Sequence, residues 1–260
     1  MSVAAAASAS ACGGKHTGSV AVGDASETST TAADGSTAPA SAGTATGPPA
    51  LVAGETAVFI VRGPTDRGQV ALTFHTDGDL TIAQRLLDVL AQRRVVATMF
   101  VVGEWLDAHP DFAARIAAGG HEFANHTYTH PTFTKLTRTA MVDEVRRCHD
   151  TLVRLTGSGG TFFRPSGTDD GIEAPPASVQ DAAAAVGYPV VLGFDVDPLD
   201  YRDPGAGAIS DRVLRVVQPG SIVSLHFGHA GTVDALPALL DGLAARNLAP
   251  VTVSRLFGYA

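Results

Sequence analysis

The chain of 260 residues lacks a cluster of Lys and Arg residues, and its net charge is −8. Because nucleic-acid binding needs a basic surface that neutralises phosphate groups, these features argue against a nucleic-acid partner. No segment approaches the roughly 20 apolar residues that a membrane-spanning helix requires. The chain also has only two cysteines. Cys148 lies in a segment with the apolar periodicity of a helix, which predicts a core position rather than a disulfide.

Aromatic residues are absent from residues 13–50, where Ser, Thr, Ala, Gly, Asp and Pro predominate. Such a tract cannot bury enough apolar surface to offset its conformational entropy, so it is predicted to be a disordered linker. Residues 1–12 form a short small-residue apolar run that ends at Cys12. This run is similar to the second half of a bacterial lipoprotein signal peptide, and the alternative is a plain Ala-rich terminus. The lipoprotein interpretation predicts an extracytoplasmic protein, secreted or attached to a membrane through a lipidated Cys12.

From residue 51 to residue 260, short β-like runs alternate with runs of helical periodicity. Strands are predicted at Ala57–Val61, Val70–Phe74, Val96–Val102, Glu122–Ala124, Thr161–Arg164, Pro189–Phe194, Ser221–His226 and Val251–Val253. Helices are predicted at Leu80–Arg94, Asp111–Ala118, Thr139–Leu155, Ala177–Ala185, Ala208–Val217 and Val233–Arg246. Repeated strand–helix alternation predicts an α/β domain of parallel strands with helices outside, in an open sheet or a barrel.

Polar side chains follow several of these strands directly. They are His75, Thr76, Asp77 and Asp79 after the second strand, His126 and His130 after the fourth, Arg164 at the fifth, Asp195, Asp197 and Asp200 after the sixth, and His226 and His229 after the seventh. Functional residues of a (β/α) barrel gather at the carboxyl ends of its strands. The sequence therefore predicts a functional site at this end of the sheet.

The pair His126 and His130 is the feature with the clearest chemistry. A four-residue spacing places both imidazoles on one face if the segment forms a helical turn. Two neutral imidazoles suit zinc, iron, nickel or cobalt, and a carboxylate from elsewhere would leave coordination positions open. This pattern predicts a metal site that performs chemistry.

The segments from about Val58 to the C-terminus resemble the NodB-homology polysaccharide deacetylases of carbohydrate esterase family 4. Five local motifs of that family occur in order, and the second, His-Ser/Thr-x-x-His, matches His126-Thr127-Tyr128-Thr129-His130. The resemblance implies a distorted (β/α) barrel over residues 51–260. It also implies a metal-dependent enzyme that removes N- or O-linked acetyl groups from a polysaccharide or a peptidoglycan-type cell-wall glycan.

The other motifs supply candidate site residues by the same resemblance. Arg164, in Thr161-Phe-Phe-Arg164-Pro-Ser-Gly167, is expected to orient a catalytic carboxylate. His226, in Ser221-Ile-Val-Ser-Leu225-His226, is expected to be the general acid, and Leu225 to line the pocket for the acetyl methyl group. Asp200 is expected to hold and polarise His226, and Tyr201 beside it to contact the substrate. Asp195 and Asp197 in the same run fit equally well as solvated loop carboxylates.

The first motif departs from the family pattern, Thr-Phe-Asp-Asp-Gly, in which the first Asp is the base and the second a metal ligand. Here the chain reads Thr73-Phe74-His75-Thr76-Asp77-Gly78-Asp79. Keeping Asp-Gly in register makes Asp77 the metal ligand and puts Thr76 in the base position, whereas an ungapped alignment puts His75 there. Neither alignment gives two adjacent carboxylates, and threonine cannot act as a general base at neutral pH. Asp79, in the loop that follows, is a candidate for the base, and the sequence leaves the identity of the base open. A later imitation of the motif, Thr168-Asp-Asp-Gly171, is explained more simply as a turn.

Three hypotheses follow from these residues. The first is an extracytoplasmic, monomeric deacetylase of acetylated glycans, with one divalent ion (zinc, or cobalt or another divalent ion) held by Asp77, His126 and His130. The second is a carbohydrate-binding lipoprotein of the same fold with impaired catalysis, which the altered first motif favours. The third is another metal hydrolase on a (β/α) barrel, which would need more carboxylate ligands than the sequence offers.

Overall fold

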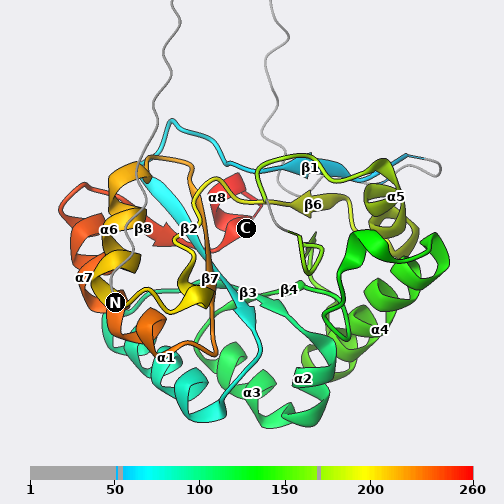
Figure 1. The fold of residues 1–260 in the computed structure, drawn as a ribbon, viewed down its shortest axis with the longest axis horizontal. Helices are drawn as coiled ribbons and strands as arrows, with labels where there is room; N and C mark the ends of the chain where they lie inside the picture. Colours follow the sequence, from blue (N-terminus) through cyan, green and yellow to red (C-terminus); the bar gives the residue numbers. More distant parts are fainter. Residues whose placement is uncertain (1–50, 52–54, 169–170, 260) are drawn as a thin grey trace, which may run out of the picture. The chain divides into compact units, whose positions relative to one another are not determined.

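A computed structural model describes residues 51, 55–168 and 171–259 of the chain. These residues contain one sheet of eight parallel strands, curled so that the helices lie mainly outside it (Figure 1). The strands are β1 (Val58–Ile60), β2 (Gln69–Thr76), β3 (Thr98–Val101), β4 (Glu122–Asn125), β5 (Phe162–Phe163), β6 (Val190–Leu192), β7 (Ile222–His226) and β8 (Ala249–Val251). The predicted signal segment 1–12 and linker 13–50 lie outside the described residues.

The order of the strands is β1-β6-β5-β4-β3-β2-β7, and β8 pairs with the first part of β2. After β6 the chain crosses to β7, where Val196 forms an isolated parallel bridge with Val223. Asp195 fixes this crossing, because its carboxylate accepts hydrogen bonds from the Ile222 backbone N–H at 2.7 Å and from the Ser221 hydroxyl at 2.9 Å. The distorted (β/α) barrel expected from the sequence is confirmed.

The helices are α1 (Leu80–Arg93), α2 (Gly103–Ala108), α3 (Pro110–Ala118), α4 (Arg138–Thr156), α5 (Ala177–Val186), α6 (Ala206–Val216), α7 (Ala230–Ala244) and α8 (Val253–Phe257), with the 3₁₀ turns η1 (Phe133–Lys135) and η2 (Asp200–Arg202). Side chains of short polar residues start three of them. Asp79 caps α1, Thr137 caps α4 and Thr252 caps α8, each accepting hydrogen bonds from N–H groups of the first turn. Within the described residues, every helix falls short of the length and apolar character that spanning a membrane requires.

Strand β2 is buried on both faces and shows how the sheet divides the core. Val70, Leu72 and Phe74 face the helical layer and pack with residues of α1 and α7. The alternate residue Ala71 faces the barrel interior and packs there with residues of the neighbouring strands. Because side chains alternate between the two faces of a strand, the next inward positions of β2 are Thr73 and His75.

The short helix α8 fills the interior at the amino-terminal ends of the strands. Val253 and Leu256 pack with the inward-facing core. The Val253 backbone N–H donates to the Thr98 hydroxyl at 2.8 Å, and Glu122 accepts hydrogen bonds from Ser254. Since Thr98 and Glu122 are the first residues of β3 and β4, the interior remains open for a site only at the opposite, carboxyl-terminal end.

Three local predictions were wrong. The segment 103–108 forms helix α2, which was not expected, and Val253 begins α8 instead of ending a strand. The segment from His126 to His130 is not helical, and Thr127 and His130 have left-handed backbone angles, with φ of 70° and 57°. The two imidazoles are therefore presented by an irregular turn after β4.

Candidate active site

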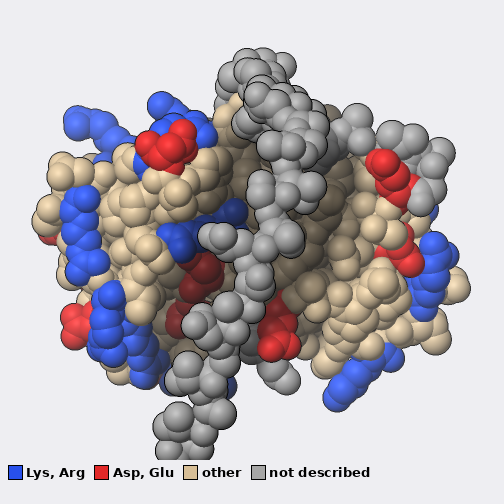
Figure 2. Space-filling view, turned by 90° about the horizontal axis from the view of Figure 1, so that it is seen from above, with Lys and Arg blue, Asp and Glu red and all other residues tan. Residues whose placement is uncertain are grey.

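A cavity of about 640 Å³ lies at the carboxyl ends of the strands. Residues that the sequence placed at this end line it, among them His75, His126, His130, Arg164, Asp197, Tyr201 and His226. On the face seen in Figure 2, the described Lys and Arg side chains are spread around the molecule and interspersed with Asp and Glu. The predicted functional end of the sheet is thus a pocket with histidines in its floor.

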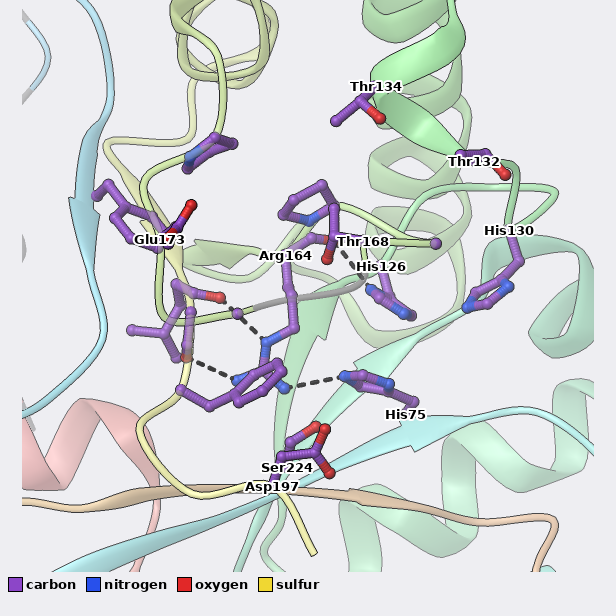
Figure 3. Close-up of a pocket in the computed structure, with 18 of the residues that line it drawn as sticks. His75, His126, His130, Thr132, Thr134, Arg164, Thr168, Glu173, Asp197 and Ser224 are labelled. Atoms are coloured by element: carbon purple, nitrogen blue, oxygen red, sulfur yellow. Dashed lines mark hydrogen bonds between the residues drawn. The ribbon is translucent and has the colours of Figure 1, made fainter. Parts of the chain in front are cut away.

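Arg164 is the buried centre of this floor (Figure 3). Its guanidinium donates to the carbonyl oxygens of Leu192 and Gly193 at 3.0 and 3.1 Å, which ties it to the end of β6. It also reaches β2, where Nη1 lies 3.0 Å from the Thr73 hydroxyl and 3.0 Å from Nε2 of His75. Burial lowers the pKa of Arg164 to about 9, and the charge of Asp197 acts in the opposite direction. An arginine expected to orient a carboxylate here contacts an imidazole instead.

The hydrogen bonds of His75 define a single arrangement of protons. Because Arg164 can only donate, Nε2 of His75 must accept, and the proton of the neutral ring is then on Nδ1. Nδ1 lies 2.9 Å from Nε2 of His226, and Nδ1 of His226 lies 2.8 Å from Oδ1 of Asp200. The protons therefore point along one path, from Arg164 through His75 and His226 to Asp200. Burial lowers the pKa of His75 well below its usual value, which agrees with the neutral ring.

Asp200 is fully buried and holds His226 by two contacts. Besides the bond to the ring, Oδ2 accepts from the His226 backbone N–H at 2.8 Å and from the Thr232 hydroxyl at 2.7 Å. The Tyr201 ring lies 5.3 Å from the His226 ring, at the edge of the pocket. The structure thus brings together Asp200, His226 and Tyr201, as the sequence predicted for their positions.

His126 and His130 lie side by side on the wall next to His75 (Figure 3). The ring centroids of His126 and His130 are 4.9 Å apart, and the His126 ring stacks on His75 at 4.2 Å. Nδ1 of His126 is bonded to the Arg164 carbonyl oxygen at 2.9 Å, whereas its buried Nε2 has no hydrogen-bond partner. Burial lowers the pKa of His126 well below its usual value and also lowers that of His130, where the charge of Asp77 acts in the opposite direction.

The carboxylates of the first motif lie apart from this floor. Asp77 follows β2 and is half-buried, but it does not line the pocket. Asp79 is exposed, and its Oδ1 accepts from the backbone N–H groups of Thr81 and Ile82 at 2.8 and 3.0 Å. Asp79 therefore serves α1 as its cap, and the structure places His75, not Asp79, beside Arg164.

Leu225 is also absent from the pocket lining. Its side chain packs in the core between sheet and helices, because it alternates with His226 along β7. Ser224, on the same face as His226, lines the pocket in its place. Counting back two residues from His226 would have identified Ser224 from the sequence.

The resemblance implies a divalent metal ion, and the residues present fit it in part. The unpartnered Nε2 of His126 beside the ring of His130 is the arrangement of two imidazole ligands. Within the described residues, no group of three or more His, Cys, Asp or Glu side chains is arranged to hold an ion. The charge of Asp77 acts on the pKa of His130, so the two side chains are near each other. Asp77 is nevertheless not grouped with His126 and His130 as a third ligand.

Comparisons with known proteins show similarity to one group of sequences. The family model described as polysaccharide deacetylase matches residues 62–191. The chain is 31% identical over 204 residues to a peptidoglycan-N-acetylglucosamine deacetylase of Bacillus cereus, covering 76% of this chain and 72% of that protein. It is 36% identical over 171 residues to a chitooligosaccharide deacetylase of Rhizobium leguminosarum bv. trifolii, covering 65% of this chain and 76% of that protein.

Two solved structures add a distinction within this group. The Bc1960 peptidoglycan N-acetylglucosamine deacetylase superposes with a TM-score of 0.70 at 30% identity, covering 78% of this chain and 94% of that one. A mutant of BA3943, described as a CE4 family pseudoenzyme with restored enzymatic activity, superposes with a TM-score of 0.72 at 25% identity, covering 79% and 73%. Active and inactive proteins therefore share this fold.

Proposed function

Because this chain belongs to the polysaccharide deacetylase family, we propose that it is a metal-dependent hydrolase that removes acetyl groups from a glycan. The observation that carries the proposal is the buried, unpartnered Nε2 of His126 beside His130, with the His226–Asp200 pair bordering the same pocket. Deacetylases of this family generally depend on a divalent metal ion. His126 and His130, with Asp77 as the proposed carboxylate ligand, would hold a divalent ion such as zinc, and such an ion would supply polarisation of the acetyl carbonyl.

His226 is the proposed proton donor to the leaving amine or alcohol. Asp200 holds the ring by Nδ1, so that Nε2 is the nitrogen directed toward His75 and the pocket. The Asp200 carboxylate accepts the Nδ1–H of His226 and so fixes the tautomer and the direction of the ring, as a proton donor at Nε2 requires. To donate to a substrate, His226 must first give up its bond to His75 and gain a proton at Nε2, which in the proposed hydrolysis comes from the attacking water.

Arg164 is proposed to orient the group that removes a proton from the attacking water. His75 occupies that position, but both of its nitrogens are bonded, one to Arg164 and the other to His226. This observation favours a second candidate function: a glycan-binding protein of the same family that hydrolyses slowly or not at all. The similar protein BA3943, whose mutant is described as a CE4 family pseudoenzyme with restored enzymatic activity, is consistent with this candidate.

The proposed substrate is an acetylated glycan, either N-acetylated, as for the similar peptidoglycan and chitooligosaccharide deacetylases, or O-acetylated. We propose an extracytoplasmic location, because the small-residue run that ends at Cys12 is similar to part of a lipoprotein signal peptide. Attachment through Cys12 and a monomeric state belong to the same proposal.

Acetate release tests the two candidates directly. The full chain would be incubated with chitin oligomers, peptidoglycan fragments and acetylated xylan, first after chelation and then with Zn²⁺ restored. If the protein is a hydrolase, we expect acetate release that is abolished by chelation and restored by Zn²⁺. We also expect His226→Asn to lower this release by about 10²-fold. If the zinc-loaded protein binds glycans but releases acetate from none of them, the hydrolase proposal is contradicted and the binding-protein candidate is supported.

A further inference from the structure

The turn that carries His126 and His130 is held by a carboxylate of α4. Glu144 is buried, and its Oε2 accepts from the backbone N–H groups of Tyr128 and Thr129 at 2.9 and 2.8 Å. Its Oε1 accepts from the Thr129 hydroxyl at 2.8 Å. Both oxygens of one side chain are thus used on the two residues just before His130.

The turn from His126 to His130 belongs to no helix or strand, so its backbone lacks the hydrogen bonds of regular secondary structure. Thr127 and His130 both have left-handed backbone angles, which non-glycine residues adopt rarely and keep only where the surroundings impose them. At the start of the turn, Oδ1 of Asn125 accepts from the Thr127 backbone N–H at 2.9 Å. The N–H groups of Tyr128 and Thr129, which follow, have Glu144 as their acceptor.

The chemistry of Glu144 points to a specific role. Within the described part of the chain it forms no ion pair with a basic side chain, although a buried carboxylate is costly without compensation. Its compensation consists of the three hydrogen bonds to the turn. Hydrogen bonds to a carboxylate are stronger than those to a neutral acceptor, so Glu144 fixes the backbone between the two imidazoles firmly.

We propose that Glu144 is a positioning residue that sets the separation and direction of the His126 and His130 rings. It touches neither ring and acts through the backbone of Tyr128 and Thr129. The inference rests on the proposed role of the two imidazoles in holding a divalent ion. Groups that orient metal ligands from outside the coordination sphere change metal affinity by about 10- to 100-fold when removed.

The test compares Glu144→Ala and Glu144→Gln with the control Glu122→Ala. Glu122 is a comparable carboxylate, because it too accepts three hydrogen bonds. Its donors are the Ser254 backbone N–H and the hydroxyls of Ser254 and Thr98, and it lies at the other end of β4. Calorimetric titration of the metal-stripped full chain with Zn²⁺ measures the affinity. We expect Glu144→Ala to weaken it about tenfold, Glu144→Gln to restore it to within about threefold, and Glu122→Ala to leave it unchanged.

A second measurement does not depend on metal. Hydrogen exchange at Tyr128 and Thr129 in the metal-free protein should be faster in Glu144→Ala and unchanged in Glu122→Ala. If Glu144→Ala does not fold, Glu144→Asp replaces it, since the shorter side chain cannot reach all three donors. Lower thermal stability with unchanged Zn²⁺ affinity and unchanged exchange would overturn the inference. A wild-type chain that binds no Zn²⁺ would refute the proposed function, and the exchange data would still decide the role of Glu144.

Discussion

His75 lies between the two residues proposed to handle protons in the pocket, Arg164 and His226. It stands beside Arg164, and its Nδ1 lies 2.9 Å from Nε2 of His226. In this arrangement the nitrogen that His226 would use as an acid already accepts a hydrogen bond from the Nδ1–H of His75. A neutral His75 ring in this position therefore blocks Nε2 of His226. It also has no free lone pair with which to accept a proton from water, because its Nε2 is bonded to Arg164.

Replacement of His75 by aspartate should therefore raise acetate release. A carboxylate would pair with Arg164, offer a free oxygen to water and leave Nε2 of His226 available to the substrate. A general base contributes about 10²- to 10⁴-fold to such reactions, so we expect at least a tenfold rise in kcat/KM on the best substrate of the panel.

The matched control is His75→Asn, which also releases His226 but supplies no base. Both variants would be measured with Zn²⁺ present, and their thermal unfolding would be compared with that of the wild type. If the aspartate variant is no faster than the asparagine variant, a missing base does not limit the reaction.

The stability of helix α1 provides a test of Asp79, the residue that the sequence offered as a candidate base. Asp79 caps this helix by accepting two N–H groups of its first turn. Loss of such a cap costs about 1 kcal/mol, so Asp79→Ala should lower the free energy of unfolding by that amount, while Asp79→Asn, which keeps a cap, should not. Urea unfolding measures both. Neither substitution should change acetate release after correction for the folded fraction, and a large loss in Asp79→Asn would restore Asp79 to the catalytic set.

The elements themselves were predictable because their patterns are long or strongly periodic. All eight strands and six of the helices coincide with predicted segments to within a few residues. Helix α2 was not predicted, since six residues between two buried segments carry too little periodicity. The turn at His126–His130 was misread as helical because its spacing of four fits a helix equally well. The actual turn is held by hydrogen bonds to Glu144 of α4, a contact that local spacing does not reveal.

The positions of site residues were predictable where the residue type and its place after a strand were enough to suggest a function. His126, His130, Arg164, Asp200 and His226 were all placed correctly near one pocket, although their roles stay predictions. Leu225 was misplaced because the motif was read without the alternation of β7, which points Ser224 inward. The base was misassigned to Asp79 because sequence spacing does not reveal that a carboxylate is engaged in a helix cap.

At the scale of the whole molecule, buried neutral histidines make the fold sensitive to acid. Outside the pocket, His121 is buried, and its Nδ1 accepts from the Ala97 backbone N–H at 3.2 Å. Burial lowers its pKa from 6.5 to about 4. Burial also lowers the pKa values of His75 and His126 well below the usual value. Each of these rings must gain a proton on unfolding in mildly acidic solution.

The sign of the effect follows from this difference. Between pH 6.5 and 4 the unfolded chain binds a proton at residue 121 that the folded chain does not, so the free energy of unfolding falls as the pH drops through that window. The stabilisation is fully present above pH 6.5. A pKa lowered to about 4 corresponds to at most about 3 kcal/mol for His121. Urea unfolding at pH 8, 6 and 4.5 should show a progressive loss, and His121→Asn, which keeps an acceptor for Ala97, should lose less over the same range. The difference between the two proteins at pH 8 is the internal reference, and an equal acid loss in both would show that His121 does not contribute.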